Sequence, residues 1–252
     1  MSLERATIVD ISKDRWKTAQ KFELEFAQNT IGSDDDWNLW WMKKYSNYSF
    51  LEGKEFQNVL EVGCGPHTNV RYILPKITVR KIWLEDPLIQ YYVTHYLTKG
   101  PSTTDTLKSL IKKPSKRVNF CLELFSNQSY SVDLSSAKLE DLPYKDGQMD
   151  LIVCINVLDH VNNYESCMSE MNRVLKSGGI LILGQDLTNA EDLVNCPETV
   201  SDIGHPIKVD HALIDNSLSR SFDTLSRKIL PREEGRNPRA HYGTYLGVFQ
   251  KR

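Results

Sequence analysis

The chain has 252 residues, with 31 lysines and arginines against 33 aspartates and glutamates, so its formal net charge is −2. Hydrophobic residues make up 40% of the sequence and charged residues 25%, which are the proportions of an ordinary globular protein. These values exclude a disordered chain, a collagen-like repeat and a coiled coil, and the length suits one large domain. The near-neutral charge argues against a protein specialised in binding nucleic acid.

No apolar run approaches the ~20 residues that a membrane-spanning helix needs. The N-terminal segment lacks the apolar core of a secretory signal, so we expect a cytoplasmic protein without a membrane partner. The five cysteines lie far apart, with no Cys-x-x-Cys pair and no cluster of cysteine and histidine. The sequence therefore predicts neither a disulfide framework nor a metal site.

The first 55 residues are expected to form a helical segment rich in aromatic side chains. Phe22 and Phe26 are spaced as neighbours on one helix face, and three helix-capping aspartates precede Trp37. Four of the five tryptophans lie in this segment, at positions 16, 37, 40 and 41. Two interpretations stay open: the segment anchors itself to the main domain, or it forms a lid over a small-molecule site.

From residue 57 onward, short apolar strands alternate with helices. Strands are expected over 57–62, 78–84, 150–155 and 180–183, and helices over 68–74, 88–97 and 164–175. Because the strands are continuously apolar, this alternation predicts a doubly wound parallel α/β sheet covered on both faces. A terminal hairpin over 222–230 and 242–249 adds an antiparallel edge. We expect residues 56–252 to form one domain, with a basic insertion at about 99–130.

The most informative segment is the turn Glu61-Val62-Gly63-Cys64-Gly65-Pro66, directly after the first strand. Its glycines let the backbone turn tightly and approach a ligand closely. A dinucleotide site would need a third glycine where Thr68 stands, so a nicotinamide cofactor is disfavoured. Glu61 is a poor neighbour for a pyrophosphate but a good one for a cationic ligand. An acid after the second strand, Glu85 or Asp86, is placed to accept hydrogen bonds from ribose hydroxyls.

With these motifs in this order, the sequence resembles the class I S-adenosylmethionine-dependent methyltransferases, the small type 11 group in particular. The resemblance covers roughly residues 57–186 and includes the glycine turn, the acid at 85 or 86, and the segments 139–144, 148–154, 156–161 and 173–179. It implies a Rossmann-like, seven-stranded, mostly parallel sheet. It also implies S-adenosylmethionine as the cofactor and S-adenosylhomocysteine as the product.

The resemblance implies a set of cofactor contacts. Gly63, Cys64 and Gly65 would pass beneath the methionine part, with Glu61 beside its amino group, directly or through water. Asp86 is preferred over Glu85 for the ribose, because Asp86-Pro87-Leu88 matches a variant found in the family. The other implied contacts are Leu139 and Glu140 at the adenine, and Ile155, Asn156 and Val157 at the sulfonium. The chain departs from the family at His67, where many members have glycine, and at Lys138, where an acid often contacts the adenine.

Methyl transfer from a sulfonium is an in-line displacement, which positioning alone can accelerate strongly. A hydroxyl acceptor also benefits from a general base, and histidine suits that role near neutral pH. His160, which follows the fourth strand, and His205, on the long loop after the fifth, are therefore candidate catalytic residues. His160 has a second interpretation, in which it only caps or packs the next helix. Further candidates are His211, His241 and Tyr242, and Asp186 could orient a base.

The tail from Arg220 to Arg252 holds eight basic and three acidic residues. It is either a solvated hairpin, or some of Arg232, Arg236 and Arg239 bind an anionic acceptor such as a phosphorylated or nucleotide-linked sugar. We expect a methyltransferase acting on a small molecule, on a hydroxyl of a sugar or related metabolite, in carbohydrate biosynthesis and without a nucleic-acid partner. The alternatives are N-methylation of a small amine or a macromolecule, and a non-catalytic cofactor-binding protein.

Overall fold

The computed structural model describes residues 7–30, 37–98, 129–189, 192, 202–236 and 243–252. Its strands are β1 (Lys54–Val62), β2 (Ile77–Glu85), β3 (Ser131–Ser135), β4 (Met149–Ile155), β5 (Leu175–Leu187), β6 (Phe222–Leu230) and β7 (Gly243–Lys251). They form one seven-stranded sheet in the order β3-β2-β1-β4-β5-β7-β6. Strands β1 to β5 pair in parallel, and β7 runs antiparallel to both β5 and β6. The predicted parallel sheet with an antiparallel terminal hairpin is confirmed.

The described helices are α1 (Lys13–Thr30), α2 (Trp37–Lys44), α3 (Val70–Ile73), α4 (Ile89–Thr98), α7 (Tyr164–Val174) and α9 (His211–Leu218), with 3-10 turns η1 (Ser46–Leu51), η2 (Leu74–Lys76) and η4 (Arg232–Glu234). Two apolar layers enclose the sheet: α7 and α9 pack on one face, and α2, η1, α3 and α4 pack on the other. The adjacent residues Val59 and Leu60 of β1 belong to opposite layers, as the alternation of side chains along a strand requires. The sheet is thus covered on both faces.

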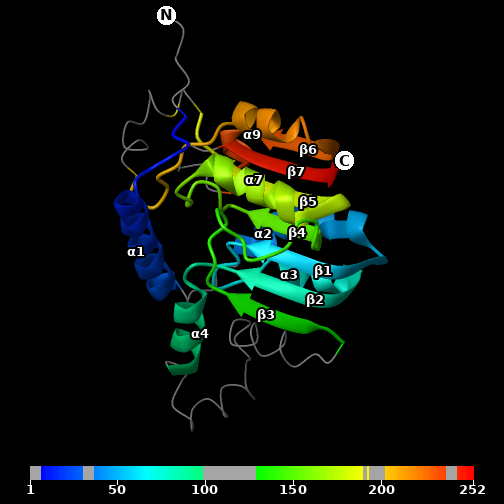
Figure 1. Cartoon of the computed structure of the whole chain (residues 1–252). Helices are drawn as coiled ribbons and strands as arrows, with labels where there is room; N and C mark the ends of the chain where they lie inside the picture. The colour runs from blue at the N-terminus through cyan, green and yellow to red at the C-terminus, as the bar shows by residue number, and fades with distance from the viewer. Residues whose placement is uncertain (1–6, 31–36, 99–128, 190–191, 193–201, 237–242) are drawn as a thin grey trace, which may run out of the picture.

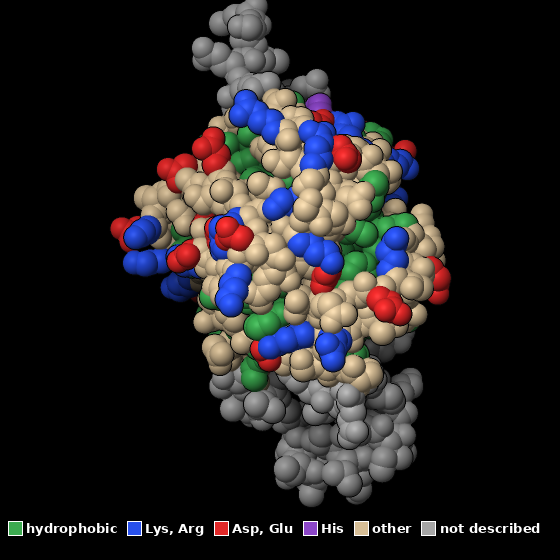
Figure 2. Space-filling view, turned by 45° about the vertical axis from the view of Figure 1, so that its right-hand side comes forward, with side chains coloured by type: hydrophobic (Ala, Val, Ile, Leu, Met, Phe, Trp, Pro, Cys, Tyr) green, Lys and Arg blue, Asp and Glu red, His purple; other side chains and the backbone are tan. Residues whose placement is uncertain are grey.

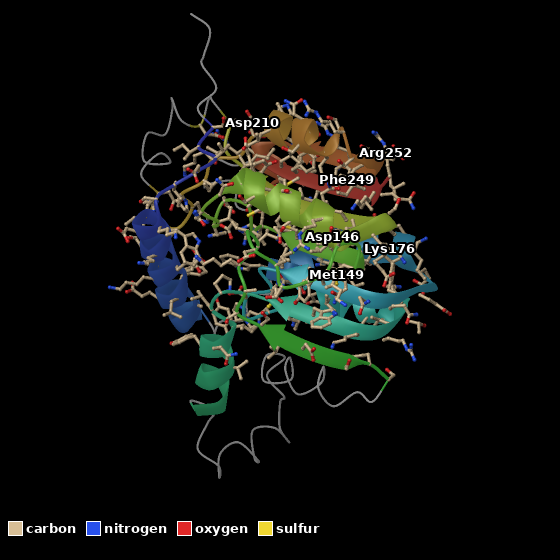
Figure 3. All side chains as sticks on the ribbon, in the orientation of Figure 1. Asp146, Met149, Lys176, Asp210, Phe249 and Arg252 are labelled. Atoms are coloured by element: carbon tan, nitrogen blue, oxygen red, sulfur yellow. The ribbon has the colours of Figure 1, made fainter. Side chains whose placement is uncertain are left out.

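Strand β4, one of the apolar segments of the sequence, lies at the centre of the sheet. All seven of its residues are buried, and the carboxylate of Asp150 accepts hydrogen bonds from the backbone N–H groups of Gln57 (2.8 Å) and Asn58 (2.6 Å) on β1. Lys176 pairs with the same carboxylate. Figure 3 shows Lys176 and Met149 at the end of the sheet opposite α1. Asp150 therefore holds β1, β4 and β5 together at that end of the sheet.

Two elements were not predicted from the sequence. Strand β3 has five residues, lies at the sheet edge, and holds polar side chains that are only partly buried, so it carries no continuous apolar signal. Helix α9 begins at the cap Asp210, whose side chain accepts from the N–H of Leu213 at 2.7 Å. Both elements are short, and neither contributes to the pocket described below.

The N-terminal segment divides into two parts with different surroundings. Helix α1 stands at the ends toward which the parallel strands point (Figure 1). In contrast, Trp41, Tyr45, Tyr48 and Leu51 are buried in the core beside β1, β4 and β5. The ring of Trp41 lies so close to Gly184 that a Cβ there would come within 2.8 Å of it. Residues 37–51 are therefore part of the packing of the sheet, whereas α1 lies across its edge.

Basic and acidic side chains are interspersed on the face of the molecule shown in Figure 2. That mixture agrees with the formal net charge of −2. This face offers no broad positive surface of the kind that neutralises a nucleic-acid backbone.

Candidate active site

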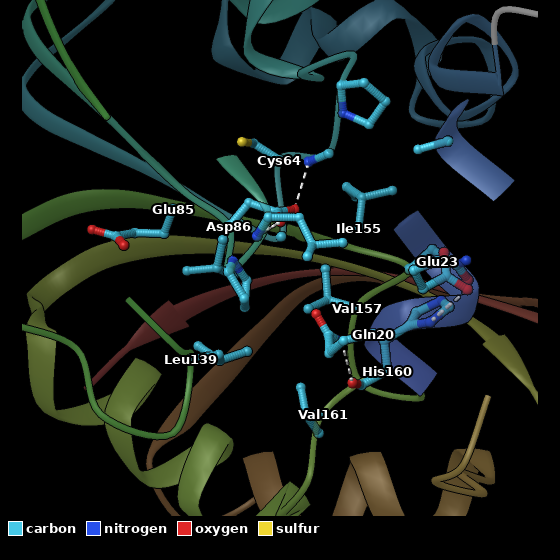
Figure 4. Close-up of a pocket in the computed structure, with 18 of the residues that line it drawn as sticks. Gln20, Glu23, Cys64, Glu85, Asp86, Leu139, Ile155, Val157, His160 and Val161 are labelled. Atoms are coloured by element: carbon cyan, nitrogen blue, oxygen red, sulfur yellow. Dashed lines mark hydrogen bonds and ion pairs between the residues drawn. The ribbon is translucent and has the colours of Figure 1, made fainter. Parts of the chain in front are cut away.

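A cavity of about 580 Å³ opens at the carboxyl ends of β1, β2 and β4. In an open parallel sheet, ligands bind at this edge. The volume lies in the range of about 300–1,000 Å³ that is usual for small-molecule sites. Helix α1 closes the cavity from outside with Trp16, Gln20 and Glu23. Figure 4 shows Glu85 and Leu139 at one end of the pocket, and Glu23 beside His160 at the other.

The glycine turn forms one wall of the pocket. Gly63 and Gly65 have φ angles of 58° and 57°, in the left-handed region that glycine adopts at little cost. A Cβ on Gly63 would lie 2.5 Å from a methyl carbon of Val157, so only glycine lets this turn pack against the loop after β4. Cys64 is buried between them and lines the same wall. His67, one of the departures from the family pattern, also lines the cavity.

Both candidate ribose acids, Asp86 and Glu85, line the pocket. The carboxylate of Asp86 accepts from the N–H groups of Gly65 (2.9 Å) and Leu88 (2.8 Å), yet burial raises the pKa of Asp86 to about 6. Glu85 accepts a hydrogen bond from the hydroxyl of Tyr144, and its other oxygen, Oε2, is buried with no hydrogen-bond partner among the described residues. A buried acceptor of this kind suits a hydrogen-bond donor on a ligand.

Glu61 lies behind the pocket wall and is almost fully buried. Its carboxylate accepts from the N–H groups of Asn69 (2.8 Å) and Val70 (3.1 Å), and from the side chains of Thr68 and Asn69. Burial raises the pKa of Glu61 to about 7, although these hydrogen bonds favour the ionised form. The structure gives this side chain the role of holding the glycine turn against the start of α3. Its predicted contact with the cofactor amino group stays a prediction.

The segment predicted to meet the adenine is held by its neighbours. Leu139 and Glu140 line the pocket, and Oε1 of Glu140 accepts from the N–H of Asn162 at 2.6 Å. Arg173 of α7 donates to the carbonyl oxygen of Leu142 at 2.9 Å and also pairs with Glu170. These hydrogen bonds hold the segment against α7 and the loop after β4.

Lys138, the second departure from the family pattern, takes a different role. Its ammonium group lies 3.6 Å from the centre of the Trp16 ring on α1, in a cation–π contact. Trp16 itself lines the pocket. The adenine segment and α1 are thus joined directly across the mouth of the cavity.

The three residues predicted at the sulfonium, Ile155, Asn156 and Val157, all line the pocket. Asn156 has a φ of 57°, and its N–H donates to the carbonyl oxygen of Gly184 at 2.7 Å. Its side-chain oxygen accepts from the N–H of Asp186 at 3.1 Å. The ends of β4 and β5 are therefore tied together where these residues face the cavity.

The two candidate catalytic histidines meet in the pocket, with ring centres 4.6 Å apart. His160 Nδ1 lies 3.1 Å from the carbonyl oxygen of Gly204 and 3.5 Å from Oε1 of Glu23. His205 Nδ1 lies 2.8 Å from Oδ2 of Asp202. Glu23, His160 and His205 each offer a ligand atom within 4.8 Å of the other two, which is a grouping that could hold a metal ion.

Carboxylates dominate the charge around these histidines. Burial opposes the charged form of His205, but its hydrogen bond with Asp202 and the charges of Asp159 and Glu23 outweigh burial and raise the pKa of His205 to about 9. Burial likewise opposes ionisation of Asp159, yet the two histidines lower its pKa. This end of the pocket therefore stabilises a positive charge.

Arg236 also lines the pocket, beside Trp37. Its guanidinium lies 4.2 Å from the centre of the Trp37 ring and 3.0 Å from Oδ2 of Asp186. Arg232 instead pairs with Asp192. Of the remaining candidates, His211 is exposed at the start of α9, and Arg239, His241 and Tyr242 lie outside the described residues.

Three further residues that line the pocket, Gln20, Glu23 and Asp202, were not predicted from the sequence. A signal for the first two exists: positions 16, 20, 23 and 27 follow the helical period, and all four face the cavity. Asp202 stands three residues before His205, a spacing that brings the two side chains together on a tight loop.

The described helices include none that is both long and apolar enough to span a membrane.

Comparisons with known proteins agree with this architecture. Residues 109–183 match the model of the methyltransferase domain family. An uncharacterized protein of Methanocaldococcus jannaschii, MJ0638, is 39% identical over 62 residues, which are 23% of this chain and 27% of that protein. The matches span about a quarter of the length of the curated relatives.

Two solved structures share the fold over nearly the whole chain. The N-methyltransferase NodS from Bradyrhizobium japonicum, in complex with S-adenosylhomocysteine, has a TM-score of 0.59 and 15% identity, covering 95% of this chain and 99% of its own. The [4+2]-cyclase SpnF has a TM-score of 0.58 and 15% identity, covering 98% and 99%. The domain match implies S-adenosylmethionine as the cofactor. Residues 109–183 therefore match a methyltransferase domain, and the sheet has the Rossmann-like fold shared with these solved structures.

Proposed function

We propose that this protein transfers a methyl group from S-adenosylmethionine to a small molecule bound beside His160 and His205. The observation that carries the proposal is one pocket that joins the glycine turn and Asp86 to the two histidines. A cofactor held at the first end would face an acceptor held at the second. Helix α1 would act as the lid over both.

The residues present fit the cofactor. Gly63 and Gly65 bring bare backbone to the pocket wall, and Glu85 Oε2 is a buried acceptor that a ribose hydroxyl can satisfy. Asp86 lies beside it at the end of β2 and serves the same hydroxyls. When bound, S-adenosylmethionine supplies an electrophilic methyl group, whose bond to sulfur breaks, with sulfur keeping the electron pair, as the bond to the acceptor forms.

A hydroxyl acceptor fits the opposite end of the pocket. His160 would accept the proton of the hydroxyl, and His205, which its raised pKa keeps protonated near neutral pH, would donate a hydrogen bond to the oxygen, with its ring oriented by Asp202. Arg236, backed by Asp186, would bind an anionic group, and Trp37 offers an aromatic surface to a sugar ring. These features favour O-methylation of a sugar or related metabolite, with the reaction in the cytoplasm.

An amine is the second candidate acceptor, favoured by the three carboxylates around the histidines, Glu23, Asp159 and Asp202. Such a ring of negative charge attracts a cationic amine. Turnover with pools of hydroxylated and amine metabolites, followed by mass spectrometry of the product, separates oxygen from nitrogen methylation. Cofactor binding without turnover on either pool would indicate a non-catalytic binding protein.

The cofactor half is tested by calorimetry with S-adenosylhomocysteine. We expect the folded protein to bind it, and Asp86→Ala to weaken binding tenfold or more, because charged hydrogen bonds contribute about 1.5–3 kcal/mol. The matched control is Asp223→Ala, an exposed acid on β6 paired with Arg252. Absence of binding at high micromolar ligand overturns the proposal. Equal affinities for Asp86→Ala and the control mean that Asp86 does not bind the ribose.

A further inference from the structure

We propose that Glu23, His160 and His205 bind a divalent transition-metal cation, which in turn binds the hydroxyl oxygen of the methyl acceptor. The cation site rests on the geometry of these three side chains. Only the role assigned to the cation rests on the proposed function. The site lies in the same pocket as the cofactor motif, at the end away from Glu85 and Leu139 (Figure 4).

Three separate elements supply the ligands. Glu23 comes from α1, His160 from the loop after β4, and His205 from the loop after β5. Their ligand atoms lie within 4.8 Å of one another, and Glu23 Oε1 is 3.5 Å from His160 Nδ1. Metal–ligand bonds of about 2.0–2.2 Å put neighbouring ligand atoms about 3–4 Å apart. Side-chain movements of about 1 Å or less would therefore complete the site.

The surroundings of His160 Nδ1 favour a proton or a metal cation at that nitrogen. Its Nδ1 faces two oxygens, the carbonyl of Gly204 at 3.1 Å and the carboxylate of Glu23 at 3.5 Å. Three electron-rich atoms converge there, so either a proton on Nδ1 or a cation must lie between them. The carboxylate of Asp159 is 3.5 Å from the other ring nitrogen, Nε2, where it favours the proton. Without a metal, a proton on Nδ1 donates to the carbonyl oxygen of Gly204; with a metal, the proton lies on Nε2 and Nδ1 binds the cation.

Both histidines have a carboxylate beside one ring nitrogen, as is usual for histidines that bind metals. Asp202 holds Nδ1 of His205 at 2.8 Å, so a metal that displaces the other proton of this ring would bind at Nε2. Asp159 Oδ1 lies 3.5 Å from Nε2 of His160 without a hydrogen bond, and its charge favours a proton on that nitrogen. Each ring therefore has a carboxylate beside the nitrogen that would not bind the metal.

The carboxylates of Asp159 and Asp202 lie beside the cluster. The side chain of Asp159 is only 8% exposed, and its Oδ1, the oxygen 3.5 Å from His160 Nε2, accepts no hydrogen bond from the described residues. Lys208 donates to the carbonyl oxygen of His205, and Arg15 donates to the carbonyl oxygens of Asp202 and Ile203. The positively charged groups of Lys208 and Arg15 therefore bind backbone oxygens beside the cluster.

The ligand set selects the class of metal. Two imidazole nitrogens and one carboxylate suit Zn²⁺, Fe²⁺ or Mn²⁺, whereas Ca²⁺ and Mg²⁺ prefer oxygen ligands. Three protein ligands leave positions open on the pocket side. A hydroxyl oxygen bound there loses its proton to solvent more easily, because the cation lowers its pKa. The cation would thus supply the activation that a general base would otherwise provide.

The test uses the full chain without a polyhistidine tag, stripped with a chelator and dialysed. Calorimetric titration with Zn²⁺ and visible absorption on adding Co²⁺ should each show one ion per chain. Glu23→Gln and His205→Asn should weaken binding tenfold or more, and Asp202→Asn about 10–100-fold, as loss of an orienting carboxylate does. His211→Ala is the matched control, since this histidine is exposed and lies away from the pocket.

Binding of S-adenosylhomocysteine is measured on the same samples. Retained S-adenosylhomocysteine binding with no uptake of Zn²⁺ or Co²⁺ by the wild-type protein overturns the metal site alone. Equal metal affinity in the wild type, Glu23→Gln and His205→Asn overturns it as well. Loss of S-adenosylhomocysteine binding in the folded wild type overturns the proposed function instead. Should a variant fail to fold by circular dichroism, the Co²⁺ titration of the wild type decides.

Discussion

Gly63 and Gly65 share a left-handed backbone but differ in their surroundings, which makes them a matched pair. A Cβ on Gly63 would lie 2.5 Å from Val157, whereas a Cβ on Gly65 would meet nothing within 4 Å. Alanine at either position costs about 1–2 kcal/mol for the left-handed conformation. At Gly63, overpacking adds about 1–3 kcal/mol. We therefore expect Gly63→Ala to lower the free energy of unfolding in urea clearly more than Gly65→Ala, and equal losses would contradict the close packing on Val157.

The raised pKa of Glu61 predicts that the stability of the protein depends on pH. Burial raises its folded-state pKa to about 7, above the ordinary value of 4.5, so the folded state binds the proton more tightly than the unfolded state does. The stabilising effect is fully present below about pH 4.5 and is lost as the pH rises to about 7. A shift of this size is on the order of 3 kcal/mol.

Glu61→Gln keeps the shape of the side chain and removes the titration. Urea unfolding of the wild type and of Glu61→Gln should therefore give free energies whose difference moves in favour of the glutamine variant between pH 4.5 and pH 7. Other titrating groups, Asp86 included, are present in both proteins and cancel in this difference. Two parallel pH profiles would show that Glu61 keeps an ordinary pKa.

At the scale of elements, α1 and α2 have separate roles. Helix α1 closes the pocket and buries chiefly the small residues Ala19 and Ala27, while Phe22 and Phe26 stay partly exposed. The stretch from α2 through η1 places Trp41 in the core of the sheet. Tyr45 in that stretch also donates to the carbonyl oxygen of Leu183 on β5 at 2.7 Å. The proposed lid is therefore α1 alone, and α2 belongs to the packing of the sheet.

Two truncations test that division. Removal of residues 1–36 should leave a chain that unfolds cooperatively but binds S-adenosylhomocysteine more weakly, because the pocket loses Trp16, Gln20 and Glu23. Removal of residues 1–53 should abolish cooperative thermal unfolding. Loss of one large buried aromatic costs about 3–5 kcal/mol, and the total stability of a domain is only about 5–15 kcal/mol. A cooperative transition in the shorter chain would show that residues 37–51 are dispensable.

At the scale of the whole molecule, the pocket depends on segments that lie far apart in the chain. The lid α1 reaches the loop before His205 through Arg15, which donates to the carbonyl oxygens of Asp202 and Ile203. It reaches the segment predicted to meet the adenine through Trp16 and Lys138, and the loop after β4 through Gln20, which donates to the carbonyl oxygen of His160. The two ends of the pocket are therefore joined by one helix.

The sequence by itself determined the parallel α/β fold and singled out residues that the structure brings together in one pocket. Continuous apolar strands can be buried only in a sheet covered on both faces, so they indicated the parallel α/β architecture. The glycine turn and the acids at 85 and 86 are local features whose conformation follows from the residues themselves. All the residues predicted at the cofactor line the pocket, except Glu61, which lies behind its wall.

Only the tertiary structure decided the composition of the pocket end that contains His160, His205 and Glu23. His160 and His205 were separate candidates in the sequence, and Glu23 was one acid among the 33 of the chain. No local pattern states that these three side chains share a pocket, because their meeting depends on how α1 and two loops pack across the edge of the sheet. The charge of the site has the same origin. A formal net charge of −2 for the whole chain says nothing of Asp159 and Asp202 facing two histidines.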